Sequence, residues 1–332
     1  MTIAQWEALT PPADGTPTVT IIVVSYGTRE MTLACLRSVV AQTKGTAYDV
    51  IVVDNASPDG SAEAIAAAFP QFQVVAETIN LGFAAANNLA ARSARGDYLL
   101  LLNPDTVVLE GAIDALLAFA RSRPDAGIWG GRTLFGDGRL NPSSCWRRQT
   151  LWNLFCRGVG LAKAFPHSPL FHSEAYGGWK RDSEREVDIV TGCWLLITQA
   201  LWQRLDGFAP AFFMYGEDAD LCLRARALGA RPRITPTATI VHYGGGTESN
   251  SARKNKRLLA AKALLIARHT PRPFRWLARI LLALRPFLKK VFAGARERVV
   301  WNEVWVDRRQ WLGGEFEDQR ADGGNQGHVH RV

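Results

Sequence analysis

The sequence predicts an α/β protein with a mainly parallel central sheet flanked by helices. Short apolar runs recur through the first two thirds of the chain, and most are followed by a segment of helical character. This alternation is typical of crossover units, which join parallel strands. The runs at 50–54 and 98–102 show no polar alternation and are too short to span a membrane. They are therefore expected to be strands buried on both faces of the sheet.

Local patterns predict each element of the first half in turn. A β-branched run gives the first strand, and Ser57, Asp59 and Ser61 can cap the helix that follows the second strand. The helix after the third strand is rich in alanine, and the fourth strand is a run of leucines. In order, strands are expected at 19–26, 50–54, 73–76 and 98–102, and helices at 30–42, 62–69, 83–94 and 111–121.

The second half is less regular. Residues 127–176 are rich in Gly, Pro, Trp and Arg and are expected to form a long, partly looped excursion. The Gly-, Asp- and Gln-rich residues beyond Trp311 are expected to be disordered. Between these segments, strands are expected at 187–190, 194–197 and 238–242, with a helix at 218–228.

The composition describes a globular protein with room for one large domain and an appendage. The chain has 332 residues, of which 47% are hydrophobic and 21% are charged. Its five cysteines form no close pair, and an odd number suits a reducing compartment better than a disulfide framework. No secretion signal or membrane-spanning run is visible, which predicts a cytoplasmic location.

The formal net charge of +8 is concentrated toward the C-terminus, where no acid interrupts the basic residues before Glu297. Residues 277–291 alternate basic and apolar side chains with a loosely helical period, and Pro286 is expected to kink that helix. Such a segment predicts peripheral attachment to the anionic inner face of the cell membrane. The alternative is a solvated basic helix packed on its own domain. Nucleic acid is not an expected partner, because no nucleic-acid motif accompanies the aromatic residues.

Two apolar strands end in carboxylates that are expected to share one cleft. Asp54 and Asn55 end the second run, and Asn103, Pro104 and Asp105 follow the leucines. The carboxyl ends of parallel strands meet at one edge, where open α/β sheets bind ligands. A carboxylate there can accept the imide N–H of a pyrimidine base, or hold a divalent cation and through it a diphosphate. Taken alone, Asn-Pro-Asp is equally consistent with a simple turn.

Three later features add a glycine, an acidic cluster and a histidine. Gly82 precedes the alanine-rich helix, where a backbone can approach a ligand closely, although a glycine alone also suits a turn. Glu217, Asp218 and Asp220 begin a helix, where the helix dipole favours acids, and either of the first two can act as a general base. His242 ends a strand before three glycines and is either a structural residue or a ligand.

These motifs occur in an order that resembles a known family. The series comprises VSY at 24–26, VVDNASPDG at 52–60, NLGFAAANN at 80–88, LLNPD at 101–105, VTGCWLL at 190–196, GF at 207–208 and FMYGEDADL at 213–221. Together they closely resemble the family 2 inverting glycosyltransferases of the GT-A fold, and in particular the WbbL-like rhamnosyltransferase branch. The resemblance covers residues 18–245. Each motif is weak alone, whereas the ordered series is specific.

The resemblance implies transfer of L-rhamnose from dTDP-L-rhamnose to a hydroxyl of a lipid-linked or cell-surface glycan, with Mg²⁺ or Mn²⁺ as cofactor. It implies that the metal is held by Asp105, the second acid of the family's DxD motif, and by His242, while Asn103 stands where the first acid would be. Asp218 falls where the family places its catalytic base, beside Glu217. The residues that it assigns to the donor are Ser25, Tyr26, Asp54, Asn55, Asn80, Gly82, Phe83, Asn87, Asn103 and Asp105, and those that it assigns to the acceptor are Thr191, Gly192, Trp194 and Tyr215.

The expected organisation is a tail at 1–16, a GT-A glycosyltransferase domain at 17–250, a basic amphipathic helical extension at 251–311 and a tail at 312–332. A UDP-hexose donor is an alternative, because one sequence does not locate the residues that read the sugar. A nucleotidyltransferase that makes sugar nucleotides is a weaker alternative, since 27–29 resemble its signature only faintly and the residues that cradle a triphosphate are missing. A non-catalytic binding protein is disfavoured because the key acids are all present. The sequence leaves open whether the chain forms a homo-oligomer.

Overall fold

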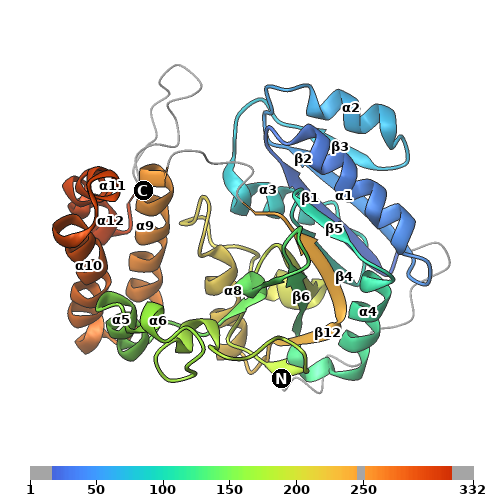
Figure 1. Cartoon of the computed structure of the whole chain (residues 1–332). Helices are drawn as coiled ribbons and strands as arrows, with labels where there is room; N and C mark the ends of the chain where they lie inside the picture. The colour runs from blue at the N-terminus through green and yellow to red at the C-terminus, as the bar shows by residue number, and fades with distance from the viewer. Residues whose placement is uncertain (1–16, 245–250, 316–332) are drawn as a thin grey trace.

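The computed structural model describes residues 17–244 and 251–315. A central sheet is covered by helices on both faces, and a separate layer of helices lies beside it (Figure 1). The tail at 1–16 and most of the tail at 312–332 lie outside the described residues, as does the run of three glycines after His242 apart from its first member. No helix in the described part of the chain is long and apolar enough to cross a membrane. The five cysteines are free and buried.

The main path of the sheet has the order β3-β2-β1-β4-β11-β6-β12-β5. Six of its strands run in one direction, and β11 and β5 run in the other. The prediction of a mainly parallel sheet is therefore confirmed. The path comprises β1 (Val19–Ser25), β2 (Tyr48–Asp54), β3 (Gln73–Ala76), β4 (Tyr98–Leu102), β5 (Thr106–Val108), β6 (Ile128–Leu134), β11 (Trp194–Thr198) and β12 (Arg233–His242).

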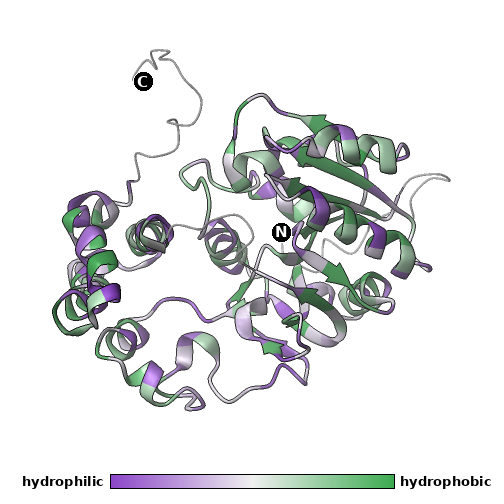
Figure 2. Cartoon of the chain, turned by 45° about the horizontal axis from the view of Figure 1, so that its top comes forward, coloured by the Kyte–Doolittle hydropathy of each residue, from purple (hydrophilic) through white to green (hydrophobic). Residues whose placement is uncertain are grey.

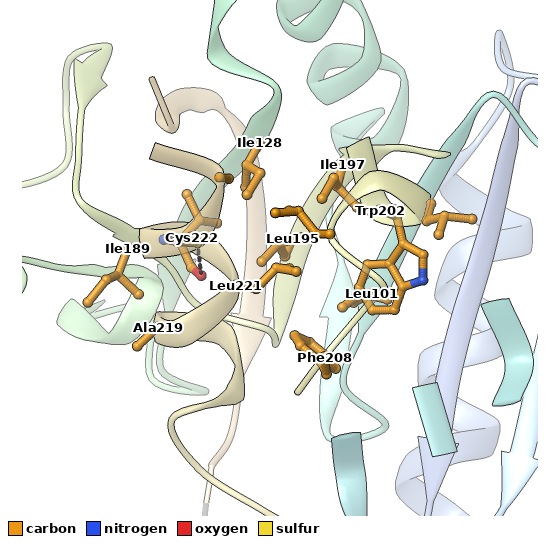
Figure 3. Packing of buried hydrophobic residues seen from close by; sticks show 14 of the residues in the cluster. Leu101, Ile128, Ile189, Leu195, Ile197, Trp202, Phe208, Ala219, Leu221 and Cys222 are labelled. Atoms are coloured by element: carbon orange, nitrogen blue, oxygen red, sulfur yellow. Dashed lines mark hydrogen bonds between the residues drawn. The ribbon is translucent and has the colours of Figure 1, made fainter. Parts of the chain in front are cut away.

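Strands β2 and β4 are buried on both faces over most of their length, as their apolar runs predict. Alternate residues enter two different hydrophobic clusters, so that Leu99 and Leu101 contribute to one face and Leu100 and Leu102 to the other. Figure 3 shows Leu221 and Cys222 of α8 close to Leu195 of β11. One face is covered by α3 (Gly82–Ala91), α7 (Gln199–Arg204) and α8 (Glu217–Ala227), and the other by α1 (Arg29–Gln42), α2 (Ser61–Ala68) and α4 (Ala112–Ser122).

The excursion at 127–176 is more ordered than the sequence predicts. It begins with β6, a strand in the middle of the sheet that the sequence analysis did not predict, because Gly130 and Gly131 interrupt its apolar run. A Cβ on Gly131 would collide with the backbone of Ala238 and the indole of Trp194, so close packing selects the glycine. The strand expected at 187–190 is also reduced, to a short β10. The remaining short elements are β7 (Leu140–Asn141), β8 (Cys145–Trp146), α5 (Leu151–Gly158), α6 (Leu161–Ala164), β9 (Arg185–Glu186), β10 (Ile189–Val190) and the 3-10 turns Pro124–Ala126, Pro142–Ser144 and Ser173–Ala175.

The C-terminal basic segment forms a helical layer that packs on the excursion. Its core joins Leu154 of α5 to Ala278 and Leu282 of α10, and to the fully buried Trp311. Helix α10 runs through Pro286 without a break in its assigned bounds. Figure 2 shows hydrophilic and hydrophobic residues alternating along these helices. The layer comprises α9 (Ser251–His269), α10 (Arg275–Phe292), α11 (Ala295–Val306) and α12 (Arg308–Gly313), with a 3-10 turn at Arg272–Phe274.

Candidate active site

The carboxyl ends of β1 and β2 place Ser25 and Asp54 side by side, because the two residues are partners in the parallel register. Both are buried. The Ser25 hydroxyl bonds to that of Thr32 at 2.9 Å. One Asp54 oxygen, Oδ2, accepts the Ser57 backbone N–H at 3.0 Å, whereas its Oδ1 is buried without a hydrogen-bond partner. Buried acceptors are normally paired, so this oxygen lacks the N–H partner that a ligand could supply.

The next loop is held by a pair of asparagines. The Asn55 amide donates to Asn80 Oδ1 at 2.9 Å, and Asn55 Oδ1 accepts the Leu81 N–H at 2.8 Å. Gly82 then begins α3 with φ +80°, and a Cβ there would lie 2.6 Å from the Phe213 carbonyl oxygen. That carbonyl accepts the Phe83 N–H at 2.8 Å. The glycine therefore lets the start of α3 lie against the segment that leads into the acidic helix α8.

Asp105 and His242 meet at the end of β4. The chain turns at Pro104 into β5, which pairs with β12 so that Thr106 lies opposite His242. This register brings Asp105 Oδ1 within 3.3 Å of His242 Nε2, with each side chain 13% exposed. Burial acts to raise the pKa of Asp105, but the hydrogen bond and charge of His242 outweigh it and hold the pKa below its usual value.

The Asp105–His242 pair fits a cation shared with a nucleotide. Among residues 17–244 and 251–315, no group of three or more His, Cys, Asp and Glu side chains could hold a metal ion unaided. Mg²⁺ in nucleotide sites commonly takes one or two protein ligands and completes its coordination with phosphate oxygens and water. Asp105 offers a carboxylate, and His242 offers the ring nitrogen Nε2, which lies 3.3 Å from that carboxylate. The donor set therefore fits Mg²⁺ or Mn²⁺ bound together with a diphosphate.

Asp218 lies in the first turn of α8 and is oriented by two backbone N–H groups. Its Oδ2 accepts the Gly192 N–H at 3.0 Å, and its Oδ1 accepts the N–H of Ala219 at 2.7 Å. Burial raises the pKa of Asp218, and these two N–H groups act against that rise. The carboxylate is thus held in one orientation at the cavity wall, which is the geometry a general base requires.

Glu217 and Asp220 have different surroundings from Asp218. Glu217 is buried with Oε2 unpartnered, and burial together with the charge of Asp218 raises its pKa. Asp220 is fully buried and bonds Arg224 and Arg268, each at 2.7 Å, and His269 at 2.8 Å. Burial alone would raise its pKa, but these three hydrogen bonds lower it to about 2. Asp220 is therefore an ionised structural anchor, whereas Glu217 is favoured in its neutral form.

A cavity of about 870 Å³ collects most of the predicted residues. It runs from the strand ends past α8 and continues between α5 and the C-terminal helices. Sequence reasoning missed that second part: the excursion gave no signal, and the C-terminal segment gave only its excess of basic residues. The predicted residues on the cavity wall are Tyr26, Asn55, Asn80, Phe83, Asn103, Asp105, Thr191, Gly192, Tyr215, Glu217, Asp218 and His242.

Five predicted residues are not on this wall. Ser25, Asp54 and Gly82 are each next in the chain to a residue of the wall, namely Tyr26, Asn55 and Phe83. Asn87 is buried and donates to the Phe83 carbonyl at 2.8 Å, so it holds the first turn of α3. Trp194 is 1% exposed and packs in the core on the α1–α4 side of the sheet. Strand alternation sends its side chain to the face opposite Leu195, and Trp194 is therefore a core residue instead of an acceptor contact.

This fold and site define a nucleotide-sugar transferase of the α/β class. The family model described as Glycosyl transferase family 2 matches residues 20–204 of this chain. The chain belongs to glycosyltransferase family 2, and it is an inverting-type enzyme with rhamnosyltransferase relatives. The membership assigns the chain to sugar transfer and replaces the nucleotidyltransferase alternative.

Two relatives illustrate this branch. The chain is 30% identical to the N-acetylglucosaminyl-diphospho-decaprenol L-rhamnosyltransferase of Mycobacterium tuberculosis, with 72% of this chain and 82% of the relative covered. It is 27% identical to the rhamnosyltransferase WbbL of Escherichia coli, over 79% of this chain and 93% of the relative.

Solved structures support the GT-A-like fold. A mannosyltransferase from Pyrobaculum calidifontis, in complex with GDP-Man and Mn²⁺, superposes with a TM-score of 0.52 at 19% identity, covering 93% of this chain and 88% of that one. S. aureus TarS residues 1–349, in complex with UDP-GlcNAc, gives 0.55 at 16% identity, over 89% and 81%.

Proposed function

We propose that this enzyme transfers L-rhamnose from dTDP-L-rhamnose to a hydroxyl group of a lipid-linked or surface-glycan acceptor. The names of the two rhamnosyltransferase relatives support this donor and acceptor class. The observation that carries the proposal is the continuity of one cavity from the Asp105–His242 pair to Asp218. A leaving diphosphate and an attacking hydroxyl can therefore be held on opposite sides of one sugar.

The nucleotide end of the donor is assigned to the ends of β1 and β2. The unpartnered Asp54 Oδ1 would accept the imide N–H of thymine, which satisfies an otherwise unpaired buried acceptor. Tyr26, Asn55, Asn80, Phe83 and Asn103 line the adjoining wall. A UDP-hexose donor presents the same imide edge, so it stays the alternative to be tested.

In this mechanism, Asp218 accepts the proton of the acceptor hydroxyl as its oxygen attacks the anomeric carbon. The bond from that carbon to the diphosphate oxygen breaks on the opposite face, and the configuration inverts in one displacement. Asp105 and His242 would hold the divalent cation. When bound, that cation supplies charge neutralisation of the leaving diphosphate. Glu217, favoured as a neutral acid, leaves Asp218 as the ionised member of the pair.

The same proposal places the enzyme on a membrane surface. Trp276, Ile280 and Val291 share one face of α10 at i, i+4 and i+15, and all three are exposed. Ala278 and Leu282 face the protein core. Basic residues flank the exposed face, which suits binding to anionic lipid.

The donor is tested with a panel of nucleotide sugars, measured by thermal shift and by donor hydrolysis with Mg²⁺, Mn²⁺ or EDTA. We expect dTDP-L-rhamnose to raise Tm and to be hydrolysed slowly in the presence of cation. UDP-glucose, UDP-galactose and UDP-GlcNAc serve as the matched donors. Stabilisation by a UDP-sugar without an effect of dTDP-L-rhamnose would replace the donor, and full activity in EDTA would remove the metal from the proposal.

A further inference from the structure

The cavity has a second arm that the reaction described above does not use. This arm lies between α5 and the C-terminal helices α9, α10 and α11. Its walls are largely apolar, and it opens into the same cavity as Asp218. The apolar residues that line it include Leu154, Leu258, Leu259, Leu281, Leu282 and Trp301.

Three cations converge in this arm around a single carboxylate. Glu174 bonds Lys262 at 2.6 Å through Oε1 and Arg157 at 2.7 Å through Oε2. Burial acts to raise the pKa of Glu174, but the charges of Lys262 and Arg157 lower it to about 2, so Glu174 is ionised. Arg285 is the third cation. Within the described part of the chain it has no hydrogen bond or ion pair, and its guanidinium lies 5.8 Å from the centre of the Trp301 ring.

The cluster therefore carries an excess of positive charge in a partly buried, apolar place. Burial and the like charge of Arg157 lower the pKa of Arg285, and the more weakly acting carboxylates Glu174 and Glu297 do not offset them. Cations in such surroundings are normally paired. A dianionic ligand would balance the excess, and a planar guanidinium binds phosphate oxygens in a bidentate manner.

We propose that this arm binds the phosphate or diphosphate group of a lipid-linked acceptor, with the first part of its lipid chain against the leucines and Trp301. The inference rests on the proposed function, because it names the acceptor's anionic linkage as the group recognised. Arg285, Lys262 and Arg157 contact that anion, and Glu174 holds the latter two cations in place. The glycan hydroxyl is thereby directed along the cavity toward Asp218.

A diphosphate is also present in the donor, so the experiment separates the two sources. Farnesyl diphosphate is the probe for the acceptor arm and dTDP is the probe for the donor arm, each titrated into the purified full chain by calorimetry. Farnesol is the uncharged comparison. Arg285→Gln removes the unpartnered cation, Arg285→Lys keeps the charge, and Arg296→Gln is the matched control because Arg296 is exposed on α11.

We expect Arg285→Gln to weaken farnesyl diphosphate binding by roughly tenfold or more, as loss of a charge-assisted hydrogen bond predicts, and to leave dTDP binding unchanged. Arg285→Lys should restore part of the affinity, and Arg296→Gln should match the wild type. Because Arg285 has no hydrogen bond or ion pair within the described residues, the Tm of the protein should change little in Arg285→Gln.

Three results would overturn the inference: equal farnesyl diphosphate affinity in wild type and Arg285→Gln, an equal weakening of dTDP binding, or equal binding of farnesol, which would exclude the anion contact. Failure of the wild type to bind dTDP, with the farnesyl diphosphate result intact, would instead overturn the proposed donor.

Discussion

Arg268 on α9 donates to the buried carboxylate of Asp220 on α8 at 2.7 Å, which joins the acidic helix of the site to the C-terminal layer. His269, from the same turn of α9, bonds the same carboxylate oxygen at 2.8 Å. The C-terminal helices are therefore part of the structure that positions Asp218, and they also form one wall of the cavity.

Asp220→Asn is expected to destabilise the protein by about 3–5 kcal/mol, because it leaves Arg224 and Arg268 without their buried anion. Urea unfolding measures the loss. The control is Glu303→Gln. The Glu303 side chain is 53% exposed, and its partner Lys256 keeps a second ion pair with Asp307, so this change should cost less than about 1 kcal/mol. Equal effects of the two variants would show that the Asp220 network is unimportant.

The Asp220 network also predicts acid sensitivity. The folded-state pKa of Asp220 lies below its ordinary value of 3.8, at about 2, so its contribution to stability is present above pH 3.8. That contribution should disappear as pH falls toward 2. The difference in unfolding free energy between wild type and Asp220→Asn should therefore shrink over this range, and a difference independent of pH would contradict the prediction.

Asp218→Asn should reduce turnover by about 10²–10⁴-fold, the usual contribution of a general base, while donor binding persists. Turnover is measured with acceptor present, and donor binding is measured separately by calorimetry. The matched variant is Glu217→Gln, which is nearly isosteric with the neutral acid and should keep most activity near pH 7. Near-normal turnover of Asp218→Asn would remove Asp218 from the role of base.

Glu217→Gln makes a second prediction about stability. The raised pKa of Glu217 means that the folded state favours the protonated form, so wild-type stability declines as pH rises from the ordinary glutamate value through the raised one. The amide cannot ionise and should not show this decline. Unfolding free energies at several pH values from 5 to 9 check it, and parallel curves for the two proteins would argue against a neutral Glu217.

Gly82→Ala is expected to cost more stability than Gly138→Ala, although both glycines have φ +80°. Left-handed strain of about 1–2 kcal/mol is common to both substitutions. At Gly138 no atom lies within 4 Å of the added Cβ, whereas at Gly82 it meets the Phe213 carbonyl at 2.6 Å. Chemical denaturation gives the loss of unfolding free energy for both variants. Equal losses would show that the start of α3 shifts to accommodate the added Cβ at little cost.

Membrane attachment is tested on the exposed face of α10, because deleting the whole layer would break the Asp220 network. Changing Trp276, Ile280 and Val291 to serine should reduce sedimentation with anionic phosphatidylglycerol vesicles and leave Tm unchanged, since Trp276 is 65% exposed. Unaltered sedimentation would show that this face does not bind lipid.

The sequence alone determined the order of strands and helices up to residue 102 and the helix at 112–122, because apolar runs and helical segments alternate there. It missed the short strand β5 (Thr106–Val108) between them. It also determined that Asp54 and Asp105 end strands of one sheet, and the ordered motifs identified the family. Periodicity records which residues are buried locally, and this is why these predictions succeed.

Only the tertiary structure decided what long-range packing controls. The glycines of β6 hide a central strand from sequence analysis, because what requires them is close contact with Trp194, a residue distant in the chain. Likewise, β5 pairs with β12, more than a hundred residues later in the chain, and this pairing brings Asp105 beside His242. The sequence also left open whether the basic segment binds a membrane surface or packs on its own domain. In the structure, α9 and α10 pack on α8 and α5, respectively, and complete the cavity. Charge and period describe one helix at a time, whereas the partner that buries it lies elsewhere in the chain.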